Sequence, residues 1–189
     1  GYNALYSNTT GTANVAVGYK ALKVNTVGTQ ITAIGYEALQ ANTTSYLTAV
    51  GYQALATNTT GAHNAALGYK ALYANTTGYK NSAFGNSSLQ ANTIGRDNTA
   101  VGWGSMSANT GGVFSTAVGS SALHSNTTGG NNDAFGYAAL LSNTTGGANT
   151  SVGSTSLYNN TTGSSNVAVG LQAMIANTTG GDNTAVGRN

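Results

Sequence analysis

The side chains that could carry chemistry are few and widely spaced in this sequence. There are two histidines, His63 and His124, and no cysteine. The four acidic residues are equally dispersed, at Glu37, Asp97, Asp133 and Asp182. A catalytic or metal site needs several titratable groups that converge on one point. The sequence therefore predicts neither an enzyme nor a site for a cofactor or metal.

Asparagine is the polar residue whose spacing is regular. One asparagine, followed by threonine, recurs at a single phase along the chain, and a second asparagine phase lies four residues before a recurring glycine. Amides stacked at strand spacing can hydrogen-bond along the column as a ladder, or they can satisfy the backbone of a turn. Both roles are structural. We predict such a ladder for Asn8, Asn25, Asn42, Asn58, Asn75, Asn92, Asn109, Asn126, Asn143, Asn160 and Asn177.

Most of these asparagines also form the acceptor motif for N-linked glycosylation, because a Thr-Thr pair follows them. We expect them on an exposed turn, and the candidate acceptors are Asn8, Asn42, Asn58, Asn75, Asn126, Asn143, Asn160 and Asn177. The alternative is that Asn-Thr-Thr simply forms the turn. Asn25, Asn92 and Asn109 favour this alternative, because they keep the asparagine and lose the motif.

A tandem repeat positions these residues. The recurring glycine, here called the marker glycine, is found at Gly1, Gly18, Gly35, Gly51, Gly68, Gly85, Gly102, Gly119, Gly136, Gly153, Gly170 and Gly187. The spacing is 17 residues except for 16 between Gly35 and Gly51, which gives eleven repeats. A fixed period in this range is typical of a stacked, solenoid-like architecture.

Each repeat has two apolar phases. The residue before the marker glycine is always apolar, and the fourth residue after it is Leu or Met. This pattern predicts two short strands per repeat, separated by turns at the marker glycine and at Asn-Thr-Thr-Gly. We predict an all-β protein, a parallel β-solenoid of eleven 17-residue coils with two short strands per coil. The missing residue between Gly35 and Gly51 falls in a turn, so the strand register should not shift.

The predicted core is thin, with valine and leucine as its main apolar residues. The residue two before the marker glycine is alanine in all repeats except at Ser151, which suggests a close approach to another chain. We therefore expect several chains to pack together. We interpret residues 1–189 as a single repeat domain that forms a segment of a longer fibrous protein.

The sequence indicates neither nucleic-acid binding nor a membrane span. Only 5% of the residues are charged, the net charge is +2, and the basic residues are scattered, so a nucleic-acid footprint is not expected. No apolar run approaches the roughly 18 residues that a membrane span requires.

An aromatic residue often follows the marker glycine. Such a column on a rod can contact a partner protein or a glycan, or it can simply pack against its neighbours. The candidate contact surface comprises Tyr19, Tyr36, Tyr52, Tyr69 and Trp103.

Three Asn-x-Ala-Val-Gly segments, at 14–18, 98–102 and 166–170, resemble the YadA-type head repeat of trimeric autotransporter adhesins and similar repeats in phage tail fibres. The resemblance implies a left-handed parallel β-roll (the solenoid type just predicted), three chains around one axis, and a role in surface attachment. The repeat here is longer than the family's usual unit, through an extended Ala-Leu-x-x-Asn-Thr-Thr-Gly arm.

Together these features predict a non-enzymatic, extracellular structural or adhesive fibre segment, a trimeric stalk or head on a cell surface or virion. Its partners would be copies of itself and a cell-surface protein or glycan. One alternative is a subunit of a self-assembling extracellular filament. A second is an ice-binding solenoid, suggested by the threonine after every asparagine. Against it, an ice-binding face needs threonines at alternating positions of a strand, whereas the Thr-Thr pairs here are adjacent.

Overall fold

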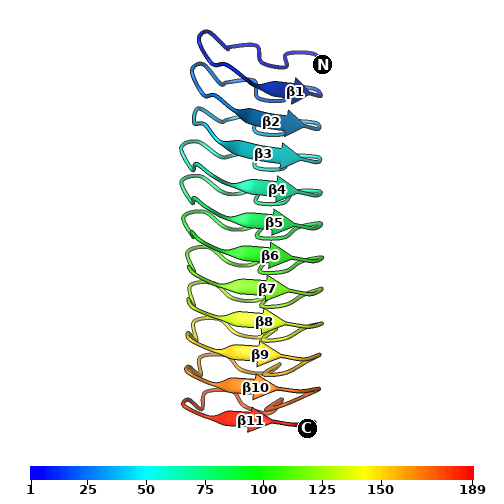
Figure 1. Cartoon of the computed structure of the whole chain (residues 1–189), viewed down its shortest axis with the longest axis vertical. Helices are drawn as coiled ribbons and strands as arrows, with labels where there is room; N and C mark the ends of the chain where they lie inside the picture. The colour runs from blue at the N-terminus through cyan, green and yellow to red at the C-terminus, as the bar shows by residue number, and fades with distance from the viewer.

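The computed structural model describes all 189 residues as a straight rod of stacked coils (Figure 1). Eleven strands form one parallel sheet, in chain order. The predicted class, an all-β parallel solenoid, is confirmed. The strands are β1 (Val15–Val17), β2 (Ile31–Ile34), β3 (Leu47–Val50), β4 (Ala65–Leu67), β5 (Ser82–Phe84), β6 (Thr99–Val101), β7 (Thr116–Val118), β8 (Asp133–Phe135), β9 (Thr150–Val152), β10 (Val167–Val169) and β11 (Thr184–Val186).

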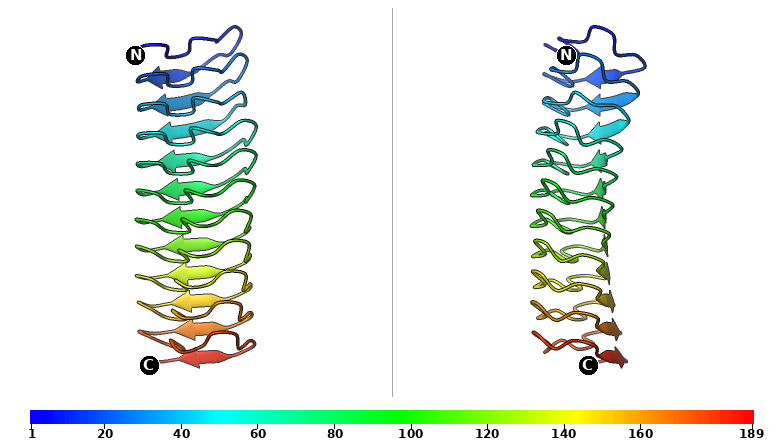
Figure 2. Two further views of the ribbon diagram at one scale, coloured as in Figure 1. Left: turned by 180° about the vertical axis from the view of Figure 1, so that it is seen from behind. Right: turned by 90° about the vertical axis from the view of Figure 1, so that its left-hand side faces the viewer.

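The coil is left-handed, as the family resemblance implies. In Figure 1 the strands run from left to right on the near side while the chain descends from the N-terminus to the C-terminus. Figure 2 shows from behind that the return path lies on the opposite side of the rod. A path that descends while moving to the right in front and to the left behind is a left-handed coil.

The strand register is kept along the whole rod. The central residues of neighbouring strands align, as Ala16 does with Ala33 in β1 and β2. Across the short repeat, Ala33 still aligns with Ala49. The missing residue therefore changes only the turn at 44–46, as predicted.

The second predicted strand is wrong, because the return arm after each marker glycine is not extended. Lys20 and Leu22 both have φ of 53°, and the same two positions are left-handed in the other coils. A parallel strand needs φ near −120°. The reason is that Ala21 and Leu22 are consecutive and both fully buried. A strand points successive side chains to opposite faces, so only a backbone of alternating handedness turns both inward.

The return arm still joins neighbouring coils. The Leu22 N–H donates to the Ala38 carbonyl in the next coil, and the Lys20 N–H donates to the Tyr2 carbonyl in the preceding coil, both at 2.9 Å. The arm is therefore held from both sides, although it lacks strand geometry.

The core consists of leucine and alanine with Ile31 and Met106. The expectation of leucine in the core is confirmed, and the expectation of valine is wrong. Leu72 and Ala83 are fully buried, whereas Val17 is 55% exposed. Alternation along each strand explains this difference, because the residue before the marker glycine points outward whenever the alanine before it points inward. Ala33 is buried inside its own coil. The small residue therefore reflects a narrow coil interior, and the expected close approach of another chain at this position is also wrong.

Candidate functional site

The asparagines that precede the Thr-Thr pairs, here called the turn column, face the coil interior where the return arm ends. Asn126 shows the pattern. Its Nδ2 donates to Oδ1 of Asn109 in the preceding coil and to the Gly129 carbonyl, each at 2.9 Å, and its Oδ1 accepts from Nδ2 of Asn143 at 2.9 Å. The same bond between coils joins Asn25 to Asn8 and links Asn42 through to Asn177. The structure therefore places all eleven predicted residues in one column.

The turn column is interrupted at the short repeat. Nδ2 of Asn42 donates to the Thr44 carbonyl at 2.8 Å rather than to Asn25. This repeat lacks the turn glycine, since Ser45 stands at its place. The Thr44 carbonyl lies against Gly28 as the Gly28 carbonyl lies against Gly11, so it takes the place of the turn-glycine carbonyl. No hydrogen bond joins the Asn42 and Asn25 side chains, so the ladder has two segments.

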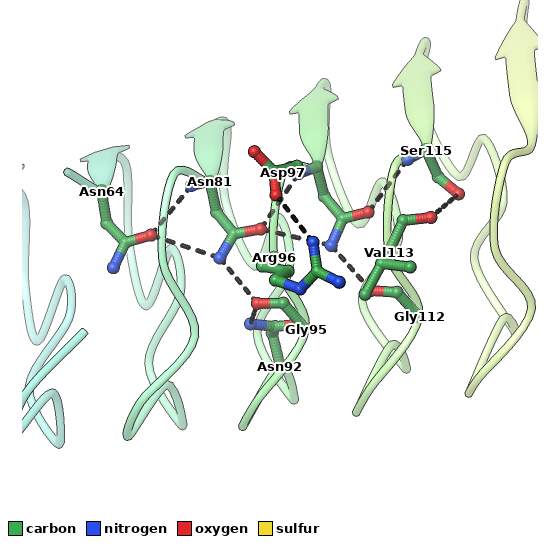
Figure 3. A network of polar contacts seen from close by, with 10 residues as sticks. Asn64, Asn81, Asn92, Gly95, Arg96, Asp97, Gly112, Val113 and Ser115 are labelled. Carbon is green, nitrogen blue, oxygen red and sulfur yellow. Dashed lines mark hydrogen bonds and ion pairs between the residues drawn. The ribbon is translucent and has the colours of Figure 1, made fainter. Parts of the chain in front are cut away.

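The second asparagine phase, here called the strand column, lies just before the strands (Figure 3). The backbone N–H and Nδ2 of Asn81 both donate to Oδ1 of Asn64, at 2.9 and 3.2 Å, and Nδ2 also donates to the Gly95 carbonyl at 2.8 Å. Ser115 replaces one asparagine and keeps the column continuous. Its N–H donates to Oδ1 of Asn98, and its Oγ accepts from the Asn132 N–H, both at 3.1 Å.

The two columns account for most of the polar interior of the rod. Every buried side-chain nitrogen or oxygen has a hydrogen-bond partner. A buried amide without partners would cost about 1–3 kcal/mol, so rotation or slippage of one coil against the next would be penalised wherever the columns are continuous. The columns therefore set the alignment of successive coils.

Six of the eight candidate glycosylation acceptors are buried inside the rod, so the expectation that they are exposed is wrong for these six. Asn42, Asn58, Asn75, Asn126, Asn143 and Asn160 have no exposed surface. Nδ2, the atom to which a glycan is attached, donates two hydrogen bonds in Asn58. Asn8 and Asn177 are partly exposed.

The threonine after the turn asparagine is also engaged in nine of the eleven coils. Oγ1 of Thr127 donates to the Thr144 carbonyl at 3.1 Å, and Thr59 bonds Thr76 in the same way at 3.0 Å. These hydroxyls tie one turn to the next. The regularity that suggested ice binding is therefore explained by turn structure.

The candidate contact residues form two separate groups. Tyr2, Tyr19, Tyr36, Tyr52 and Tyr69 stack in one column, with ring centroids 5.0–5.8 Å apart. Neighbouring rings cover both faces of the inner tyrosines. Partial burial, together with the Glu37 carboxylate, raises the pKa of Tyr36. Trp103 stands apart from the stack and is 59% exposed.

A serine hydroxyl and a histidine imidazole, the two groups of a nucleophile–base pair, lie side by side on the return side. Oγ of Ser107 is 2.8 Å from Nδ1 of His124 in the next coil. Burial lowers the pKa of His124, which favours the neutral imidazole. A catalytic pair also needs a third group that orients the base, and the hydrogen bonds and ion pairs of this rod give His124 no carboxylate partner. No cavity adjoins the pair. Sequence reasoning missed it because one repeat separates the two residues.

A charged and aromatic cluster lies at the turn edge. The Arg96 guanidinium lies 4.7 Å from the Phe114 ring centre and 5.8 Å from that of Tyr79. Asp97 pairs with Arg96 at 3.2 Å (Figure 3). The charges of this cluster are thus largely satisfied within it.

Comparisons with protein-family models, curated proteins and solved structures found no match to this chain. The chain also contains no helix of the length and apolar character needed to cross a membrane.

Proposed function

We propose that this chain is a non-enzymatic structural segment of an extracellular fibre that mediates surface attachment. The observation that carries the proposal is the construction of the interior. One parallel sheet and two amide columns, which are interrupted at the short repeat, repeat the same bonds from coil to coil, and the polar atoms of the interior are used within the rod. Such a segment acts as a stiff spacer. It transmits force and separates what lies at its two ends.

The proposed assembly is a bundle of parallel chains, three in number by analogy with the YadA-type repeats that the sequence resembles. Low charge supports this arrangement, because closely packed copies with 5% charged residues repel one another weakly. The proposed location is the outside of a cell or virion, where the contact partner is a surface protein or a glycan.

The location can be tested with antibodies raised against the purified rod. Immunogold labelling of intact producing cells or particles should decorate projections on the outside. An irrelevant antibody of the same class is the control. Labelling that appears only after the cells are opened, spread through the interior, would overturn the proposal.

A further inference from the structure

The outward side of the sheet carries an apolar column that runs the length of the rod. It consists of the residue before each marker glycine and is here called the valine column: Val17, Ile34, Val50, Leu67, Phe84, Val101, Val118, Phe135, Val152, Val169 and Val186. Eight of these eleven side chains are 36–76% exposed, and the other three are partly exposed. A sheet face that contacts water is normally polar on its outward positions. This sheet is inverted, with asparagine inside and valine outside.

The second outward column of the sheet is small and almost uncharged. It contains Thr99, Thr116 and Thr150 in the middle strands, and Asp133 is its single charged residue. Together the two columns form the strand face. Two copies of a face with one carboxylate each can approach with little electrostatic cost, whereas the return side of the rod carries Lys20, Lys23 and Lys70.

The area of the strand face matches what a stable interface needs. Burying one aliphatic side chain removes roughly 60–120 Å² of apolar surface, so eleven half-exposed residues leave roughly 300–700 Å² uncovered. The neighbouring threonine column brings the face close to the roughly 800 Å² per partner of a standard interface. Monomers rarely expose a contiguous apolar patch of more than a few hundred Å².

From these observations we infer that the strand face binds a second copy of this chain, with the valine columns packed against each other. This inference rests on the proposed fibre function and identifies the surface through which its chains associate. The tyrosine stack and the turn-edge cluster then lie outside the contact. They remain available to other partners.

Two double variants separate the strand face from other exposed apolar residues. Val118→Lys with Val152→Lys places two charges on the strand face, where the parent residues are 36% and 38% exposed. The matched control, Val27→Lys with Ile94→Lys, makes the same chemical change at the turn edge, where the parent residues are 57% and 63% exposed. Circular dichroism verifies that both variants keep the parent fold.

The readout is particle mass by multi-angle light scattering over a dilution series. We expect the parent and the turn-edge variant to have the same multiple of the chain mass, and the strand-face variant to fall to the 18.8 kDa of one chain. An assembled strand-face variant, or a dissociated turn-edge variant, would overturn the assignment of the face and leave the fibre function standing. A monomeric parent overturns the inference outright. If that monomer also shapes ice crystals and the strand-face variant does not, the face binds ice instead.

Discussion

The turn column offers a sharp test, because one atom exchange reverses its hydrogen bonding. In Asn126→Asp an oxygen replaces Nδ2, which now donates to Asn109 Oδ1 and the Gly129 carbonyl at 2.9 Å each. Two buried acceptors then face a third acceptor. Two lost hydrogen bonds at about 0.5–1.5 kcal/mol each, and two orphaned acceptors at about 1–3 kcal/mol each, predict a loss of about 3–9 kcal/mol in the free energy of unfolding at neutral pH.

The matched control is Asn131→Asp in the same coil. Asn131 is exposed and has φ of 57°, a conformation that aspartate tolerates. We expect this variant to lie within about 0.5 kcal/mol of the parent. Urea unfolding, followed by circular dichroism and by the fluorescence of Trp103, measures both.

The pH dependence of Asn126→Asp adds a second readout. The buried carboxyl should have a pKa above the roughly 3.9 of an unfolded aspartate, because its charged form faces two oxygens. The folded state then favours the protonated form, so the penalty is smallest below pH 3.9 and grows as the pH rises above it. Equal losses for the two variants, independent of pH, would refute the ladder.

Further predictions concern the core, the glycines and His124. Leu72 is fully buried, so Leu72→Asp should lower the free energy of unfolding by at least about 3 kcal/mol. Lys70→Ala in the same arm should lower it by under about 0.5 kcal/mol, and thermal melts compare the two. Similar losses for the two variants would contradict the assignment of Leu72 to the core. A Cβ on Gly102 would lie 2.6 Å from the Gly119 carbonyl oxygen, whereas one on Gly104 meets nothing within 4 Å. Gly102→Ala should therefore cost about 2–4 kcal/mol and Gly104→Ala about 1 kcal/mol in urea unfolding, and the reverse order would exclude close coil contact at the marker glycine. Burial lowers the pKa of His124, so the unfolded chain takes up the proton first and stability falls as the pH drops below about 6.5. His124→Gln should reduce that fall between pH 7 and 5 in chemical denaturation, and an unchanged pH profile would show that His124 does not contribute.

The repeat and the solenoid could be predicted from the sequence because the period is strict and glycine marks each turn. The place of the deletion in the short repeat could be predicted for a related reason. Removing one residue from a strand would turn every following side chain to the opposite face, so a deletion that keeps the register must lie in a turn. The asparagine columns could be predicted as well, because amides at a constant phase have few other uses in a chain that is 5% charged.

The face of each strand could not be predicted from polarity. In Asn98-Thr99-Ala100-Val101 an ordinary assignment buries the valine, whereas the structure buries Asn98 and Ala100. The inversion is stable because the stacked amides satisfy one another, a property of the assembled column and not of one repeat. A signal for the single strand was present in the small residue, Ala or Ser, that directly precedes the Leu or Met of each repeat. Two consecutive buried residues do not fit strand alternation.

The asparagine columns can be observed most directly through hydrogen exchange of their side-chain amides. In ¹H–¹⁵N spectra of the rod transferred to D₂O, the Nδ2 protons of buried residues such as Asn92 and Asn109 should persist long after those of exposed Asn159 have vanished. The side-chain amides of the glutamines on the return side serve as internal controls. Protection confined to the buried asparagines is the predicted result. Uniformly fast exchange of all side-chain amides, in a rod that retains its circular dichroism, would contradict the account.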